Sequence, residues 1–313
     1  MSARRVAASL LAAAAVLGAL ALSGCGLGAG PAPSAVQLVV TRDFGSRVLG
    51  RTGALKVKGQ ETVMSLLMRN YPVTTRYGGG FVQSIDGLSG GQEAGEPVDW
   101  FFYVNGVGAS KGAAATNVHP GDHIWWDRHN WSQTEDIQAV VGLFPEPFLN
   151  GIEGKRFPVR IECADVTGYA CRTVTARLRA FDVPAAIAAI GSGGAPETLR
   201  VLVGPWADVA GDLDAQSIDD GPRASGVYAR FSANGRTLTL LDQNGRAART
   251  LLAGAGLIAA TRRAEDAPVW VVTGTDGTGV ELAARAFDEA TLQDRFAVAL
   301  VPGGALPLPV VGG

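Results

Sequence analysis

We predict an α+β fold from this sequence: a small domain with one helix against a mixed sheet, followed by an α/β-type second domain. Up to residue 131, short stretches with strand periodicity surround a single helical pattern. Beyond residue 155, strand patterns alternate with helical ones, which is typical of a sheet covered by helices. A connector over 132–154 separates the two, and its Pro145 and Pro147 disfavour a helix and predict extended backbone.

The first predicted domain spans 36–131 and has the element order β-α-β-β-β. Its helix places Val63, Leu66 and Leu67 at i, i+3 and i+4, which gives one apolar face. Asn105-Gly106 is a strong turn signal at the end of the aromatic third strand, because both residues tolerate positive φ. The predicted strands are 36–42, 81–85, 100–104 and 123–127, and the predicted helix is 62–70.

The second predicted domain spans 155–313 and belongs to no family that we recognise. Two of its stretches, 199–231 and 269–300, repeat the order strand, helix, strand, with Asn234-Gly235 predicting a hairpin after the first. The predicted helices are 172–181, 207–218 and 278–290, and the predicted strands are 157–162, 199–204, 226–231, 236–242, 257–261, 269–274 and 295–300.

The N-terminal residues predict an exported protein. Arg4-Arg5 precede an uncharged, Ala/Leu-rich run and then Leu22-Ser23-Gly24-Cys25, which resembles the bacterial lipobox. We therefore expect a lipoprotein signal peptide over 1–24, acylation of Cys25, and a Gly/Ala/Pro-rich tether over 25–35. A plain signal peptide with a chance cysteine, or an uncleaved anchor helix, are the alternatives. The expected location is extracytoplasmic, with a lipid anchor in the cell membrane.

The net charge limits the kinds of partner that we expect, and the cysteines predict a disulfide. The formal net charge of −2 and the absence of a Lys/Arg cluster argue against a nucleic-acid partner. Apart from Cys25, the cysteines are Cys163 and Cys171, which in an oxidising compartment predict a local disulfide. Closing so short a loop stabilises the fold by ~2–3 kcal/mol on the chain-entropy model.

The segment 100–131 contains four of the six tryptophans and all three histidines. Alternation along the strands puts Phe101 and Tyr103 on one face, and Trp125 on the opposite side from Ile124 and Trp126. One face of this small sheet must be core, and the other is exposed unless the second domain or a ligand covers it. We therefore predict a ligand-binding face made by Phe101, Tyr103 and Trp125, with His123 at its edge.

The order of motifs over 60–130 resembles a known family. Its parts are YGGGFVQSIDG, WFFYVNG with the small-residue stretch after it, and the Gly-Asp turn of HPGDHIWWD. They are similar to the C-terminal domain of transcobalamin and intrinsic factor, which also occurs in bacterial surface proteins as a domain of unknown function. The resemblance implies a small β-grasp-like fold over about 36–130. In the vertebrate carriers, this domain helps to enclose cobalamin against a larger helical domain, which this chain lacks.

Three further groups of residues are candidate sites. His119, His123 and His129 match no known metal spacing and are expected to be solvated residues of turns and edges. Gly274, Gly277 and Gly279 lie between a strand and a helix, where amides could hold an anion, although Gly-rich turns are common. The remaining group is expected to form a solvated face rather than a calcium site, and consists of Asp212, Asp214, Asp219 and Asp220.

The leading functional hypothesis is a non-enzymatic, membrane-anchored binding module for a small molecule, or an accessory of an uptake system. A corrinoid-like ligand is the sharpest version, and no cofactor or metal is expected. The alternative is a structural adaptor that docks a transporter or envelope protein and has no ligand of its own. A hydrolase is the third and weakest hypothesis, because no nucleophile motif occurs and every histidine lies in one small domain.

Overall fold

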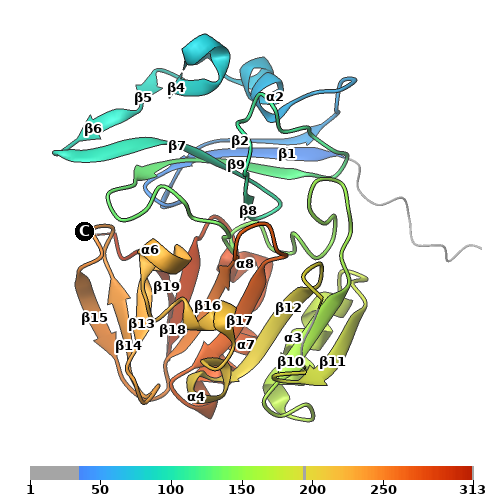
Figure 1. Ribbon diagram of the computed structural model, residues 1–313, viewed down its shortest axis with the longest axis vertical. Helices are drawn as coiled ribbons and strands as arrows, with labels where there is room; N and C mark the ends of the chain where they lie inside the picture. The colour runs from blue at the N-terminus through green and yellow to red at the C-terminus, as the bar shows by residue number, and fades with distance from the viewer. Residues whose placement is uncertain (1–34, 193–194, 312–313) are drawn as a thin grey trace, which may run out of the picture. The chain divides into compact units, whose positions relative to one another are not determined.

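The computed structural model describes residues 35–192 and 195–311 (Figure 1). The predicted signal peptide, Cys25 and all but the last residue of the predicted tether lie outside the described residues. Within that described part, none of the helices has the length and apolarity needed to cross a membrane. Residues Ala35–Gly313 form one compact unit, so the two predicted domains pack together within it.

The first part is built on a mixed sheet with the strand order β2-β1-β9-β7-β6. β1 runs parallel to β9, and the other neighbours are antiparallel. A small antiparallel sheet, β3-β4-β5, stands beside it, and β8 pairs with the end of β7. The strands are β1 (Val36–Arg42), β2 (Arg47–Leu55), β3 (Val73–Arg76), β4 (Phe81–Ile85), β5 (Leu88–Ser89), β6 (Gly91–Glu93), β7 (Glu96–Val104), β8 (Val107–Gly108) and β9 (His123–Asn130).

Helix α2 (Val63–Asn70) covers one face of this sheet. Thr62 caps its N-terminus in a reciprocal capping box with Ser65, which satisfies two backbone donors that a helix start otherwise leaves unpaired. The apolar side of α2 packs in one core cluster with Trp100 and Trp126. Half of the aromatic segment is thus needed for the core of the first part.

The second part is built on a seven-stranded sheet with the order β11-β10-β12-β17-β16-β18-β19. The first four strands are parallel, and the last three are antiparallel to their neighbours. The strands are β10 (Val159–Cys163), β11 (Ala185–Ala189), β12 (Leu199–Pro205), β16 (Gly256–Thr261), β17 (Val269–Gly274), β18 (Ala297–Val301) and β19 (Gly304–Leu308). A separate antiparallel sheet contains β13 (Ala229–Phe231), β14 (Leu238–Leu241) and β15 (Ala247–Leu251).

Helices α3 (Tyr169–Arg179) and α7 (Gly277–Arg285) pack against each other and against this sheet. The shorter helices are α4 (Trp206–Val209), α5 (Leu213–Gln216), α6 (Pro222–Ser225) and α8 (Glu289–Leu292). A disulfide joins the end of β10 to the first turn of α3, through Cys163 and Cys171, with their Cα atoms 5.9 Å apart.

The α+β prediction is confirmed, and several elements differ in extent. The helix predicted over 207–218 is two short helices, because Asp212 caps a new start at α5 with its carboxylate. The helix predicted over 278–290 likewise ends at Arg285, and Asp288 caps α8. Strands β2, β3, β5, β6, β8, β11, β15 and β19 were not predicted.

The connector over 132–154 is not extended, as the prolines had suggested, but forms consecutive turns from residue 142 to 150. The turns are closed by backbone bonds from Phe144 to Val141, from Glu146 to Leu143 and from Phe148 to Pro145. Pro145 and Pro147 stand where no backbone donor is needed. The middle of the connector is buried between the two parts: Val140 and Val141 are both fully covered.

A shared aromatic core joins the two parts. Phe296, just before β18, lies 5.0 Å from the ring of Trp125, 5.5 Å from that of Tyr103 and 5.3 Å from that of His129. Phe44, in the loop after β1, contacts Phe296 and also Tyr228 of the second part, at 5.2 Å in each case. Both parts therefore bury apolar surface in one continuous cluster.

We predict that Phe296→Ala destabilises the whole protein by about 3 to 5 kcal/mol, because it opens a cavity in the shared core. Equilibrium unfolding in urea, followed by tryptophan fluorescence, measures the loss, and one cooperative transition is expected. Tyr77→Ala is the matched control, since that ring is 85 % exposed, and its change should stay within about 0.5 kcal/mol. An unchanged midpoint for Phe296→Ala would refute the shared core.

Candidate functional site

The predicted ligand-binding face is covered by the second part of the chain. Trp125 is 0 % exposed and Tyr103 is 2 % exposed, and both pack on Phe296. Phe101 is half-buried and stacks on His129 at 4.5 Å. His123 is also half-buried, and burial lowers its pKa to about 4. Of the two alternatives for this face, a ligand or the second domain, the structure shows the second domain.

The expectation of solvated histidines is wrong for His129. This residue is 1 % exposed, and its Nδ1 lies 2.8 Å from Oδ1 of the buried Asp127. The Asp127 carboxylate also accepts from the backbone amides of Phe44 (3.1 Å) and Gly45 (2.8 Å), so it organises the loop after β1. Over the described residues, no three His, Cys, Asp or Glu side chains are grouped so that they could hold a metal ion.

The glycines at the junction of β17 and α7 do not form an open anion site. The Asp276 carboxylate accepts from the amide of Gly279 at 2.9 Å and from that of Gly254 at 2.8 Å, so the chain supplies its own anion there. Gly279 is required by crowding: an added Cβ would lie 2.0 Å from the carbonyl oxygen of Ala255.

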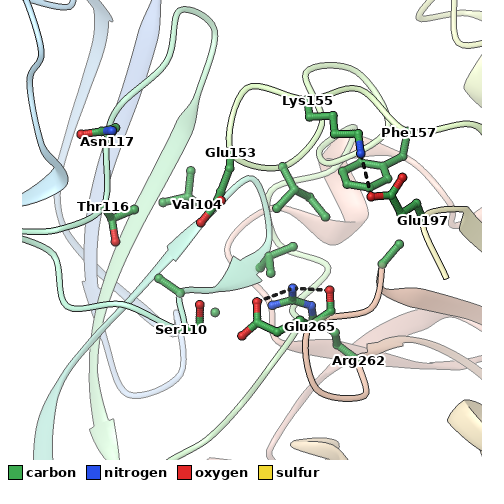
Figure 2. A pocket seen from close by; sticks show the side chains of 15 residues that line it. Val104, Ser110, Thr116, Asn117, Glu153, Lys155, Phe157, Glu197, Arg262 and Glu265 are labelled. Atoms are coloured by element: carbon green, nitrogen blue, oxygen red, sulfur yellow. Dashed lines mark hydrogen bonds and ion pairs between the residues drawn. The ribbon is translucent and has the colours of Figure 1, made fainter.

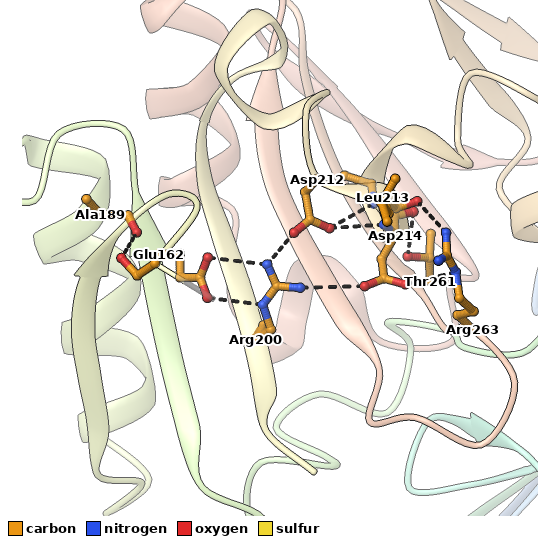
Figure 3. A network of polar contacts seen from close by, with 10 residues as sticks. Glu162, Ala189, Arg200, Asp212, Leu213, Asp214, Thr261 and Arg263 are labelled. Atoms are coloured by element: carbon orange, nitrogen blue, oxygen red, sulfur yellow. Dashed lines mark hydrogen bonds and ion pairs between the residues drawn. The ribbon is translucent and has the colours of Figure 1, made fainter. Parts of the chain in front are cut away.

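The predicted acidic face is largely an internal ion network (Figure 3). Arg200 on β12 donates from Nε to the buried Glu162 at 3.0 Å, and its guanidinium also contacts Asp212 and Asp214. Asp219 accepts from the indole of Trp206 at 3.2 Å and from the amide of Phe231 at 3.0 Å. Asp212, Asp214 and Asp219 are thus partly buried in contacts within the second part, so the expectation of a solvated face is wrong for these three, whereas Asp220 is exposed as expected.

A cavity of about 320 Å³ lies where the two parts meet (Figure 2). One wall comes from the second part: Phe157, Glu197 and Ala267 each stand two residues before the first residue of β10, β12 and β17. Because these three strands are parallel, their amino ends share one edge of the sheet. The opposite wall consists of the β7–β8 hairpin and the residues around it, Val104, Val107, Gly108, Ala109, Ser110, Thr116 and Asn117.

Glycines let the connector press against the β7–β8 hairpin. Gly106 (φ 78°) accepts a backbone bond from Val140, and Gly108 donates one to Gln138. A Cβ on Gly106 would lie 2.9 Å from the Val140 carbonyl oxygen, and one on Gly108 would lie 2.7 Å from that of Ile137. The glycines of the Val-Asn-Gly-Val-Gly motif therefore form the turn and also leave room for the connector backbone to pack against the hairpin.

Asn105 fastens the wall of the cavity to the first sheet. Fully buried, it donates from Nδ2 to Asp122 Oδ1 at 2.9 Å and to the carbonyl of Gly151 at 2.8 Å. Its Oδ1 accepts from the amide of His123 at 2.8 Å. The next residues after Gly151, Ile152 and Glu153, line the cavity. The Asn-Gly and Gly-Asp turns of the sequence motif thus meet in space and position a segment far along the chain.

Glu146 and Asn150 position the segment around Gly151 through a second set of hydrogen bonds. The Glu146 carboxylate, 0 % exposed, accepts from the amide of Asn150 at 2.9 Å and from its Nδ2 at 2.5 Å. Asn150 Nδ2 also donates to the Gly121 carbonyl at 3.0 Å. Burial raises the pKa of Glu146 to about 7, and the charge of nearby Asp122 acts in the same direction, although the bonds from Asn150 oppose it.

The cavity combines an apolar surface with charges of both signs. Its apolar lining is Val104, Val107, Ile152, Phe157 and Ala267. At the rim, Lys155 pairs with Glu197 at 2.7 Å, and Glu153 pairs with Lys111 at 3.4 Å, with all four side chains more than half exposed. Deeper in, Arg262 is 7 % exposed, and its Nε and Nη2 donate to the carbonyls of Asp266 (2.6 Å) and Glu265 (3.0 Å).

Sequence reasoning did not predict the charged residues of this cavity. The candidate ligand sites in the sequence were an aromatic sheet face and the glycines at the carboxyl end of β17, where α/β sheets commonly bind ligands. The cavity instead lies at the amino edge of β10, β12 and β17. The Asn105-Gly106 turn was the one available signal, since it marks the hairpin that forms the facing wall.

Fold and site together define an α+β protein in which a small mixed sheet and its hairpin close over the amino edge of an α/β sheet. Residues 60–130, which include α2, β7 and the hairpin, match the family described as Domain of unknown function (DUF4430). No curated protein matches the chain. One solved structure with some similarity is a "putative metal binding protein" from Ruminococcus gnavus ATCC 29149. It is 13 % identical, with 31 % of this chain and 97 % of that chain covered and a TM-score of 0.26, which is too slight to bear on function.

We predict that Glu146 makes stability fall as pH rises. Its folded pKa of about 7 lies above the ordinary 4.5, so its contribution is complete below about pH 4.5 and is lost as pH passes 7. The unfolding free energy of the wild type, relative to Glu146→Gln, should therefore fall by on the order of 1 to 3 kcal/mol between pH 4.5 and 8. Urea unfolding at several pH values measures it.

The control for this prediction is Glu153→Gln, whose side chain is 63 % exposed. Its stability difference from the wild type should stay nearly constant with pH. A Glu146→Gln curve parallel to the wild-type curve would show that Glu146 does not titrate across this range.

Proposed function

We propose that this protein is an extracytoplasmic, membrane-anchored lipoprotein that binds a small molecule, without catalysis, in the cavity between its two parts. The observation that carries the proposal is the cavity of about 320 Å³ with one wall from each part. Ligand sites occur preferentially where domains meet, and this volume lies at the lower end of about 300–1,000 Å³ for small-molecule pockets.

The resemblance to the transcobalamin C-terminal domain supports a ligand at this place. In those carriers, the corresponding domain encloses cobalamin against a larger helical domain. Here the first part faces an α/β part instead, and the β7–β8 hairpin forms one wall of the cavity. A corrinoid is far bulkier than the cavity, so we favour a smaller ligand over the corrinoid version.

The anchoring half of the proposal rests on the sequence. Leu22-Ser23-Gly24-Cys25 has the spacing of a lipobox, and the first strand starts at Val36. A short tether of this kind would hold the binding part close to the outer face of the cell membrane.

We predict that filling the cavity abolishes binding without unfolding the protein. The probes are amino acids, dipeptides, short-chain fatty acids and cobinamide, scored by the shift in melting temperature, because a ligand at 100 times its Kd stabilises by about 2.7 kcal/mol. Ser110→Trp puts a large ring at the mouth from an exposed position, so the shift should vanish.

Ala189→Trp is the matched control, because it adds the same ring at an exposed position at the opposite, carboxyl end of β11. It should retain the wild-type shift. A shift that survives Ser110→Trp would place binding elsewhere. A wild-type protein that no probe shifts, but that co-purifies with a permease, would favour the adaptor over the binding module.

We predict that Cys25→Ala releases the protein from the membrane, because the acylated thiol is the proposed anchor. Fractionation of cells that express the full chain, followed by immunoblotting, measures the distribution, and the wild type should remain with the membrane. Cys163→Ala serves as the control for loss of a cysteine. Membrane retention of Cys25→Ala equal to that of the wild type would overturn the lipoprotein assignment.

A further inference from the structure

We infer that the cavity binds a small molecule that carries a carboxylate on an apolar body, and that Arg262 is the partner of that carboxylate. The inference rests on the proposed function, because it names the class of ligand for the same cavity. It depends on three features of Arg262: its side chain is buried, its guanidinium is held by backbone carbonyls, and its charge lacks a close counter-ion. It also depends on the apolar surface around this residue.

The guanidinium of Arg262 is fixed in place by the backbone of its own loop. Arg262 follows β16 directly, and the loop returns to β17 through Glu265 and Asp266. Two carbonyls of that return accept from Nε and Nη2, as Figure 2 shows in part for Glu265. Nη1 donates no hydrogen bond to any residue in the described ranges. The side chain is thus oriented in advance, with donor capacity to spare.

The charge of Arg262 lacks a close counter-ion. Throughout the described chain, the sole carboxylate oxygen within 4.0 Å of it belongs to Glu265, at 3.7 Å, and that side chain is 76 % exposed. Two other arginines with largely buried side chains differ: the side chain of Arg128, 5 % exposed, pairs with Glu93 at 2.5 Å, and that of Arg200, 14 % exposed, pairs with Glu162 at 3.0 Å. Burial of a cation without a close partner is unfavourable, and a ligand carboxylate would supply one.

The apolar residues of the lining determine what kind of ligand body fits the cavity. Val107, Ile152, Phe157 and Ala267 give an apolar surface that a chain of a few carbons can cover. The rim carboxylates of Glu153 and Glu197 already have lysine partners, so they add no net field that would repel an anion. A fatty acid and an amino acid therefore share the recognised chemistry, and the test separates them.

The experiment measures the affinity of the wild-type protein, by isothermal titration, for hexanoate, leucine, hexylamine and hexanol. We expect hexanoate or leucine to bind, and hexylamine and hexanol to bind at least tenfold more weakly. Tighter binding of leucine than of hexanoate would identify an amino acid as the source of the carboxylate, and the reverse order would identify a fatty acid.

Three variants assign the carboxylate partner. Arg262→Met should weaken carboxylate binding about ten- to a hundredfold, because a charge-assisted hydrogen bond is lost. Glu265→Gln should strengthen carboxylate binding, because a competing carboxylate is removed. Since this variant keeps Arg262, it still tests the inference if Arg262→Met fails to fold. Arg263→Met is the matched control at a neighbouring, 55 % exposed arginine, and it should bind as the wild type does.

The outcomes separate this inference from the proposed function. Binding of hexylamine or hexanol in preference to the carboxylates, lost in Ser110→Trp, would overturn the carboxylate class and leave the binding module intact. Carboxylate binding that neither Arg262→Met nor Glu265→Gln alters would also overturn it. Binding of none of the four probes, nor of any of the wider set above, would remove both proposals together.

Discussion

The contact of Phe296 with the aromatic face of the first sheet determines how the rest of this protein is arranged. Trp125, Tyr103 and His129 present rings on that face, and Phe296 meets all three within 5.5 Å. A small sheet with one helix can cover only one of its faces, so the second needs another partner. Because the α/β part supplies that partner, the two parts share a core, and the cavity lies at the border of the contact.

At the border of this contact lie buried polar groups. They act through the geometry of their hydrogen bonds rather than through charge. Asn105 links the hairpin, the Gly-Asp turn and Gly151 through three hydrogen bonds, so the segment that follows it stands at the cavity wall. A hydrophobic contact has no preferred direction, whereas an amide with all its partners in place fixes one register. The aromatic core thus provides the affinity between the parts, and the Asn105 network provides their alignment at the cavity.

Much of the fold could be predicted from the sequence, and little of the cavity. Strands β1, β4 and β17 were predicted to the residue, because their apolar patterns are continuous and their ends carry turn residues. The exposed β2 and β11 were missed, since edge strands carry no buried face to pattern. Arg262 gave no signal at all: its burial follows from tertiary packing of three loops, and periodicity describes only one element at a time.

The aromatic motif that first suggested a ligand is instead part of the contact between the two parts. At the carboxyl edge of β17, Asp276 accepts from the amides of Gly254 and Gly279, and at the sheet face Phe296 covers the rings. At the amino edge of β10, β12 and β17, the hairpin and the residues around it leave a cavity, and one lining residue is a cation without a close counter-ion. The feature that sets this edge apart is an incompletely compensated charge, rather than richness in aromatic or acidic residues.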